Sequence, residues 1–166
     1  MVSEYSPEVV ADLRAMVRQG ISAWGFPPSA EVKLLNLSEN ATFLVRDPAA
    51  GKADLVLRLH RVGYSSAEEI RSELAWVAAL GRERAVEIAR PVAGRNGEYV
   101  QVLASPGGRA SRHAVAFERV PGLEPEAGAD LPDWFSRLGA VTARMHGHSR
   151  RWPRPAWFKR RVWDFA

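Results

Sequence analysis

The chain has 166 residues, of which 46% are hydrophobic and 25% charged, and its formal net charge is +4. These values are typical of a soluble globular protein with one domain, or with a small domain and part of a second, and they exclude a disordered composition. The lack of cysteine excludes disulfides and thiolate metal sites. The sequence has neither a secretory signal nor an apolar run of membrane-spanning length, which predicts a cytoplasmic protein without a membrane partner.

The first third of the chain predicts a helix followed by three strands. Ser6 and Pro7 are typical of a helix start and Gly20 of a helix end, so a packing helix is expected over residues 6–20. Short turns separate the apolar runs that follow, which predicts an antiparallel meander. Its strands are expected at about 32–37, 42–46 and 54–60.

A second helix and the rest of the sheet come next. Ser66 and Glu69 have the spacing of a capping box, which predicts a helix over about 67–80. Further turn signals separate three short apolar runs, so the antiparallel sheet should have about five strands. These later strands are expected around 92, 99–103 and 113–119.

The last quarter of the chain predicts a linker and a third helix. Residues 121–130 are rich in Pro, Gly and acidic residues, as linkers between lobes are. Asp130 is expected to cap a helix that ends at about His146. The apolar face of this helix would consist of Phe135, Leu138, Val141, Thr142 and Met145.

Two charged residues interrupt the apolar patterns. Alternation along residues 54–60 puts Arg58 on the face opposite the leucines, and helical periodicity puts Glu73 inside the apolar arc of its helix. A carboxylate buried without a partner costs several kcal/mol, so a cation should lie beside it. The pattern therefore predicts an ion pair between Arg58 and Glu73, and the alternative is that both are partly solvated surface groups.

Five segments in their order resemble the N-terminal half of the aminoglycoside phosphotransferase family, which includes homoserine-kinase-like and choline-kinase-like members. The segments are LSENATFLV, LVLRLHR, IRSELAWVAAL, AFERVPG and LGAVTARMHGHS, and the resemblance extends from about Lys33 to Phe165. It implies an α+β, protein-kinase-like fold. The implied parts are a nucleotide-binding N-lobe over 1–120, a hinge or linker over 121–130, and the start of a truncated helical C-lobe over 131–166.

The resemblance also implies a phosphate site. The turn from Leu37 to Phe43 would lie over the ATP phosphates. Arg58 would stand where kinases carry the strand lysine that contacts the α and β phosphates, and Glu73 would hold that cation in place. Ser38 and Asn40 would be side-chain donors, and the backbone amides facing the phosphates would be those of Glu39, Asn40, Ala41 and Thr42.

The segment AFERVPG would be the hinge that holds adenine. Phe117 would sit at the back of the adenine pocket, while the Glu118 carbonyl and the Val120 amide would pair with the adenine edge. Such a hinge uses backbone groups, so the identity of its side chains matters little.

The resemblance implies transfer of the γ-phosphoryl group of ATP to a hydroxyl group of a small molecule, helped by Mg²⁺. The family's HGD-type catalytic loop and its later metal-binding aspartate do not occur in these 166 residues, and MHGHS does not supply them. We therefore expect the ATP-binding half of a kinase, with no catalytic residue and no metal ligand in this chain. Amino alcohols, sugars, aminoglycosides and protein hydroxyls remain open as acceptors.

Two other functions are compatible with the sequence. A non-catalytic, pseudokinase-like nucleotide-binding module would share the Arg58 and Glu73 prediction. The basic tail, which carries aromatic residues between its cations, would suit nucleic-acid binding. Such a run more often docks against, or continues into, a missing C-terminal lobe, with its charges solvated or paired to acids there. The tail cations are Arg150, Arg151, Arg154, Lys159, Arg160 and Arg161, and its aromatic residues are Trp152, Trp157, Phe158 and Trp163.

Overall fold

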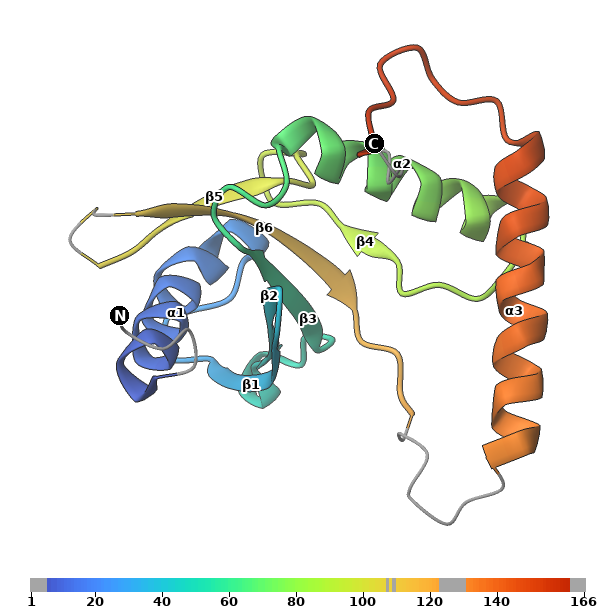
Figure 1. Ribbon diagram of the computed structural model, residues 1–166. Coiled ribbons are helices and arrows are strands. Elements are labelled where there is room, and N and C mark those ends of the chain that lie inside the picture. Colours follow the sequence, from blue (N-terminus) through green and yellow to red (C-terminus); the bar gives the residue numbers. More distant parts are fainter. Residues whose placement is uncertain (1–5, 107, 109, 123–130, 162–166) are drawn as a thin grey trace.

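A computed structural model describes residues 6–106, 108, 110–122 and 131–161. The fold is α+β, with helices packed on an antiparallel sheet, as predicted (Figure 1). The helices are α1 (Pro7–Gly20), η1 (Ile21–Trp24), η2 (Pro48–Ala50), α2 (Ala67–Arg82) and α3 (Leu131–Arg151). The strands are β1 (Glu31–Leu37), β2 (Asn40–Arg46), β3 (Leu55–His60), β4 (Pro91–Val92), β5 (Gln101–Ala104) and β6 (Ser111–Glu118).

The sheet has six strands, one more than the five or so predicted. Strands β1, β2 and β3 form the expected meander, and the order then continues through β6 to β4. Strand β5 pairs with β6 as well, so the short strands β4 and β5 occupy successive stretches of one edge of β6. Strand β3 is therefore central, with β2 and β6 as its neighbours.

Helix α1 covers one face of the sheet and builds the larger core. Its buried residues Leu13, Met16 and Val17 pack in one cluster with the leucines of β3. Phe43 of β2 is fully buried in this cluster. The face that α1 covers is thus a dry, apolar core of the kind that dominates folding stability.

Gly20 is the last residue of helix α1, as predicted, and it has a second role in packing. Helix α1 ends there, but the chain continues into η1, and the φ angle of Gly20 is −90°, which any residue can adopt. A Cβ atom at this position would lie 2.3 Å from Cδ2 of Leu103 in β5. The glycine therefore allows close contact between the helix end and the sheet.

Helix α2 covers the opposite face with a smaller core. Ile70 and Leu74 pack against Val100, Val115 and Phe117. The predicted capping box is present, because the Ser66 hydroxyl accepts from the backbone of Glu69 and the Glu69 carboxylate accepts from the backbone of Ser66. The capping box fixes where α2 begins, and so which residues of α2 face the sheet.

Helix α3 stands apart from the sheet, and the segment after it returns to α2 (Figure 1). The predicted apolar face of α3 is largely exposed, with Phe135 66% and Leu138 57% accessible, and His148 is the buried residue among its described side chains. The helix also extends beyond the predicted end, to Arg151. Asp130 and most of the predicted linker lie outside the described residues.

No helix in the described ranges combines the length and the apolar character needed to cross a lipid bilayer.

Candidate functional site

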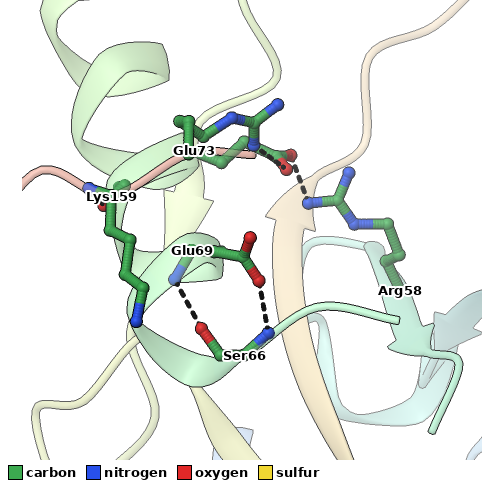
Figure 2. A network of polar contacts seen from close by, with 7 residues as sticks. Arg58, Ser66, Glu69, Glu73 and Lys159 are labelled. Atoms are coloured by element: carbon green, nitrogen blue, oxygen red, sulfur yellow. Dashed lines mark hydrogen bonds and ion pairs between the residues drawn. The ribbon is translucent and has the colours of Figure 1, made fainter. Parts of the chain in front are cut away.

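Arg58 and Glu73 form the predicted ion pair. Nη2 of Arg58 lies 2.5 Å from Oε1 of Glu73, and Figure 2 shows the guanidinium of β3 directed at the carboxylate of α2. The side chains are 24% and 26% accessible, so the pair is partly buried rather than sealed from water. Both side chains extend from their elements toward each other (Figure 2).

The sheet register explains why Arg58 meets α2. Arg58 lies opposite Thr42 of β2 and opposite Val115 of β6. Residues directly opposite in a ladder share a face, and Val115 belongs to the cluster under α2. Alternation along β3 thus puts its leucines toward α1 and its arginine toward α2.

The Arg58 side chain has donor capacity left after this contact. Its guanidinium lies over the ring of Phe117, 5.3 Å from the ring centroid. Its Nε atom is buried and has no hydrogen-bond partner in the described part of the chain. A buried donor without a partner is costly, so this nitrogen is an unsatisfied group in the cluster.

Glu73 is held in its ionised form by two arginines. Burial by itself would raise the pKa of Glu73, but the charge and hydrogen bond of Arg58, with the charge of Arg160, lower the pKa below its ordinary value. Nη1 of Arg160 lies 3.3 Å from the second carboxylate oxygen, Oε2. Each oxygen of Glu73 therefore faces a different guanidinium.

His60 is part of the same cluster and was not predicted as a site residue. It is 4% accessible, and its Nε2 has no hydrogen-bond partner among the described residues. Burial, and then the charge of Arg58, lower the pKa of His60 to about 4, so the imidazole is neutral near pH 7. The strand alternation, which puts His60 two positions after Arg58, was the signal that could have identified it.

The turn between β1 and β2 lies over the end of β3. The Ser38 N–H donates to the carbonyl of Asn40 at 3.1 Å, and the Asn40 side chain accepts from the backbone N–H of Arg61. Glu39 is exposed and pairs with Arg61 at 3.2 Å. The Ser38 hydroxyl accepts from the side chain of Asn36.

The residues after this turn lie inside the sheet. Ala41 is 1% accessible and faces the larger core, and it pairs with Leu37 of β1 and Leu59 of β3. Thr42 likewise has strand partners on both sides. The tip of the turn, at Ser38 and Glu39, is therefore the part of the predicted loop that lies beyond the strands.

The predicted hinge residues lie at the end of β6. Phe117 is half-buried under α2, and the Glu118 N–H donates to the carbonyl of Arg90 at 2.8 Å. Val120 follows the strand and is 60% accessible. Among the described residues, the backbone amide of Val120 has no hydrogen-bond partner.

The basic tail docks on α2, which sequence reasoning did not predict. The backbone N–H of Lys159 donates to the buried Ser72 hydroxyl at 2.8 Å, and the Lys159 ammonium pairs with Glu68 at 2.8 Å. Arg161 donates to the backbone carbonyl of Tyr64 at 2.7 Å. These contacts join residues about ninety positions apart, and no local pattern in the sequence indicates them.

A cavity of about 150 Å³ lies where the turn, the end of β3 and the tail meet. It borders Glu73 on the side of Arg160. Its lining includes Asn40, His60, Tyr64, Glu73, Arg160 and Arg161.

A metal site does not emerge from the described residues, which contain no group of three His, Cys, Asp or Glu placed to hold a metal ion. His148, the buried histidine of α3, instead lies with its Nε2 3.2 Å from a carboxylate oxygen of Glu83 at the end of α2. We therefore assign no ligand of Mg²⁺ to this part of the chain.

Comparisons with known proteins agree with this architecture. The chain is similar to a microcompartment-associated aminopropanol kinase, with 40% identity, a TM-score of 0.78, and coverage of 90% of this chain and 45% of that one. It is also similar in fold to an amicoumacin kinase solved with AMP-PNP, Ca²⁺ and Ami, with 22% identity, a TM-score of 0.70, and coverage of 97% and 45%. The chain thus spans about half the length of both structures. A comparison with curated proteins gave no match.

The sequence profile of the phosphotransferase enzyme family, abbreviated APH, matches residues 31–166. The match includes every residue of the cluster around Glu73 and all six strands of the sheet. The chain therefore belongs to the aminoglycoside phosphotransferase family, in agreement with the resemblance that its sequence segments indicated.

Proposed function

We propose that this chain is the ATP-binding part of a small-molecule kinase that transfers the γ-phosphoryl group of ATP to a hydroxyl group. The observation that carries the proposal is the Arg58–Glu73 pair, in which a sheet cation is held by a helix carboxylate at 2.5 Å. Phosphoryl transfer depends mainly on positioning the phosphates and stabilising their charge, and a strand cation held by a helix glutamate is the usual kinase device for this.

In this proposal Arg58 contacts the α and β phosphates through donors that Glu73 leaves available. Arg58 makes its ion pair through Nη2, whereas its buried Nε has no partner among the described residues. A guanidinium donates in a planar fork, so Nε and a neighbouring N–H can face one phosphate oxygen pair. Glu73 fixes the orientation of that fork before the nucleotide binds.

The turn and the hinge would hold the two ends of the nucleotide. The tip at Ser38 and Glu39 has backbone groups beyond the strands, and Asn40, Ala41 and Thr42 anchor it to the sheet. This anchoring would place the tip over the phosphates. At the other end, Phe117 would border adenine, with the Glu118 carbonyl and the Val120 amide on the adenine edge.

A divalent metal belongs to this reaction, where it neutralises phosphate charge. The amicoumacin kinase, which was solved with AMP-PNP and Ca²⁺, supports the use of a nucleotide with a metal. The described residues contain no group of three His, Cys, Asp or Glu placed to hold a metal ion, so we assign no step to it here. We likewise assign no general base to this chain.

Among the acceptors that the sequence leaves open, a small amino alcohol is favoured. The support is the 40% identity to an aminopropanol kinase over most of this chain. Sugars, aminoglycosides and protein hydroxyls are the alternatives. Incubation with radiolabelled ATP and a panel of these acceptors would distinguish them, and a protein that binds ATP but phosphorylates none of them would be a non-catalytic nucleotide-binding module.

Nucleic-acid binding is less favoured because two cations of the tail already face carboxylates. Lys159 pairs with Glu68 and Arg160 with Glu73, which reduces the positive charge open to a phosphate backbone. Binding of single-stranded DNA that falls steeply between low and moderate salt would support this function instead.

Titration with ATP tests the proposal through a matched pair of variants. Arg58→Ala removes the proposed phosphate contact, whereas Arg46→Ala removes an arginine that pairs with Asp54 at 2.9 Å on the same sheet. Loss of a charged hydrogen bond to phosphate should weaken ATP binding by about tenfold or more in Arg58→Ala. Arg46→Ala should bind ATP as the wild type does. Equal affinities of the two variants, measured by calorimetry, would contradict the proposal.

A further inference from the structure

The segment from Trp157 to Arg161, which we call the strap, attaches to α2 through Lys159 and Arg160, and to the residues before α2 through Arg161. Lys159 donates through its backbone to Ser72, and its ammonium reaches Glu68. Arg160 reaches Glu73, and Arg161 reaches the Tyr64 carbonyl before α2 begins. A segment from beyond α3 is thereby fixed to the helix that carries the phosphate-positioning carboxylate.

Arg160 shares the Glu73 carboxylate with Arg58. Oε1 of Glu73 accepts from Nη2 of Arg58 at 2.5 Å, and Oε2 accepts from Nη1 of Arg160 at 3.3 Å. An arginine beside a free carboxylate tends to bind both oxygens through two parallel N–H groups. Because Arg160 occupies Oε2, Arg58 is left with a contact to Oε1, and its Nε has no partner in the described part of the chain.

The second arginine also changes the charge of the cluster. Arg58 and Glu73 alone form a neutral pair, which would attract phosphates weakly. With Arg160 the three side chains carry a net charge of +1. His60 is neutral near pH 7 and leaves this balance unchanged.

We propose that Arg160 is a positioning residue for phosphate binding, which acts by occupying the second oxygen of Glu73 so that Arg58 keeps its donors and its charge for the nucleotide. This inference rests on the proposed function, because it concerns the same phosphate site. In this proposal the strap does more than hold α2 in place, because it also determines how strongly Arg58 attracts phosphate.

The test compares Arg160→Gln with Lys159→Gln in the full chain. Both variants remove one positive charge from the strap and one ion pair with α2, and Lys159→Gln keeps the backbone bond to Ser72. Because Arg160 is half exposed, we expect Arg160→Gln to weaken ATP binding by about threefold to fivefold. Adenosine, which has no phosphates, should bind both variants equally, and Lys159→Gln should bind ATP like the wild type.

A second measurement follows the carboxylate itself and needs no nucleotide. The charge of Arg160 lowers the pKa of Glu73, so Arg160→Gln should raise the pKa of that carboxyl group in a carbon-13 NMR titration. Lys159→Gln should leave it unchanged. Arg160→Lys, which restores the charge, should recover part of the ATP affinity and part of the pKa shift.

The outcomes separate this inference from the proposed function. If the wild type binds ATP but Arg160→Gln and Lys159→Gln have equal ATP affinities, the role of Arg160 is wrong and the nucleotide site stands. An equal loss of ATP and adenosine binding in Arg160→Gln would also refute it, since this would indicate general loosening of α2. If the wild type binds no ATP, the proposed function fails and this inference fails with it.

Discussion

The two faces of strand β3 have different chemistry. Toward α1 the strand presents Leu55, Leu57 and Leu59 to a large apolar cluster. Toward α2 it presents Arg58 and His60 to a small apolar cluster, the carboxylate of Glu73 and the guanidinium of Arg160. A strand can carry an apolar face and a charged face at once, because successive side chains point to opposite faces of the sheet.

The contrast indicates that the two faces of the sheet have different roles. The α1 face is closely packed and excludes charge, so it can supply most of the stability that a domain needs. The α2 face holds polar groups whose partners are incomplete, such as Nε of Arg58 and Nε2 of His60. Incompletely satisfied buried groups cost stability, and they are expected where a ligand binds.

The largest expected effect compares the same substitution on each face. Leu57 lies in the α1 cluster at 1% accessibility and Leu74 in the α2 cluster at 5%, but Leu74 also borders an apolar cavity of about 300 Å³. Leu57→Ala should lower the free energy of unfolding by about 4–5 kcal/mol and Leu74→Ala by about 2–3 kcal/mol. The smaller cost follows because a side chain beside a cavity loses fewer contacts.

Urea unfolding of both variants measures this difference. The Ile70→Val substitution, at a fully buried position of α2, provides a reference for a small loss on that face. Equal costs for the two leucines would mean that the faces are packed equally well, and that the contrast between them is one of charge alone.

The next effect is a pH dependence that belongs to the α2 face. Burial, the charge of Arg58 and the charge of His113 lower the pKa of His60 from 6.5 to about 4, although Glu73 opposes this shift. Between pH 6.5 and pH 4, His60 is protonated in the unfolded chain but stays neutral in the folded chain. Stability should therefore fall as the pH falls from 6.5 to 4, by on the order of 3 kcal/mol.

The variant His60→Gln isolates this contribution. Its unfolding free energy should vary less between pH 6.5 and 4.5 than that of the wild type. Glu73 contributes separately and at lower pH. Folding lowers its pKa, so its stabilisation is present above pH 4.5 and is lost as the pH falls through the pKa of Glu73 in the folded protein. If both proteins lose stability equally above pH 4.5, His60 is not the group that titrates.

Local sequence patterns predicted much of the fold and the ion pair at the centre of the candidate site. Ser66 and Glu69 fixed the start of α2 through the capping box, and alternation in β3 put Arg58 on one face. The helical period put Glu73 on the face of α2 that meets the sheet. These predictions succeeded because each depends on geometry within a single element.

The features that were missed depend on contacts between distant segments. Arg160 meets Glu73 across 87 positions, and its neighbours in the sequence gave it the appearance of a solvated basic run. On α3, periodicity identified the apolar residues correctly but not what packs on them, and Phe135 and Leu138 are exposed. A period shows which face of a helix is apolar, whereas burial depends on a second surface.

The smallest expected change in stability comes from replacing the whole ion pair. A partly buried pair can often be exchanged for apolar residues at little cost, whereas removal of one partner leaves a charge uncompensated. The double variant Arg58→Met with Glu73→Leu should thus unfold within about 1 kcal/mol of the wild type, because Arg160, which then has no anion, is half exposed to water. The single variant Glu73→Leu should lose about 1–3 kcal/mol, because Arg58 and Arg160 then face each other without an anion.

The double variant should keep its stability but lose its affinity for ATP. The double variant restores packing on the α2 face but has no cation on β3, so under the proposed function its affinity for ATP should be as low as that of Arg58→Ala. A double variant that is stable and still binds ATP with full affinity would show that this charged face is not the phosphate site. A double variant as unstable as Glu73→Leu would mean that the ion pair stabilises the fold more than an apolar pair does. Both faces of β3 would then contribute to the free energy of unfolding.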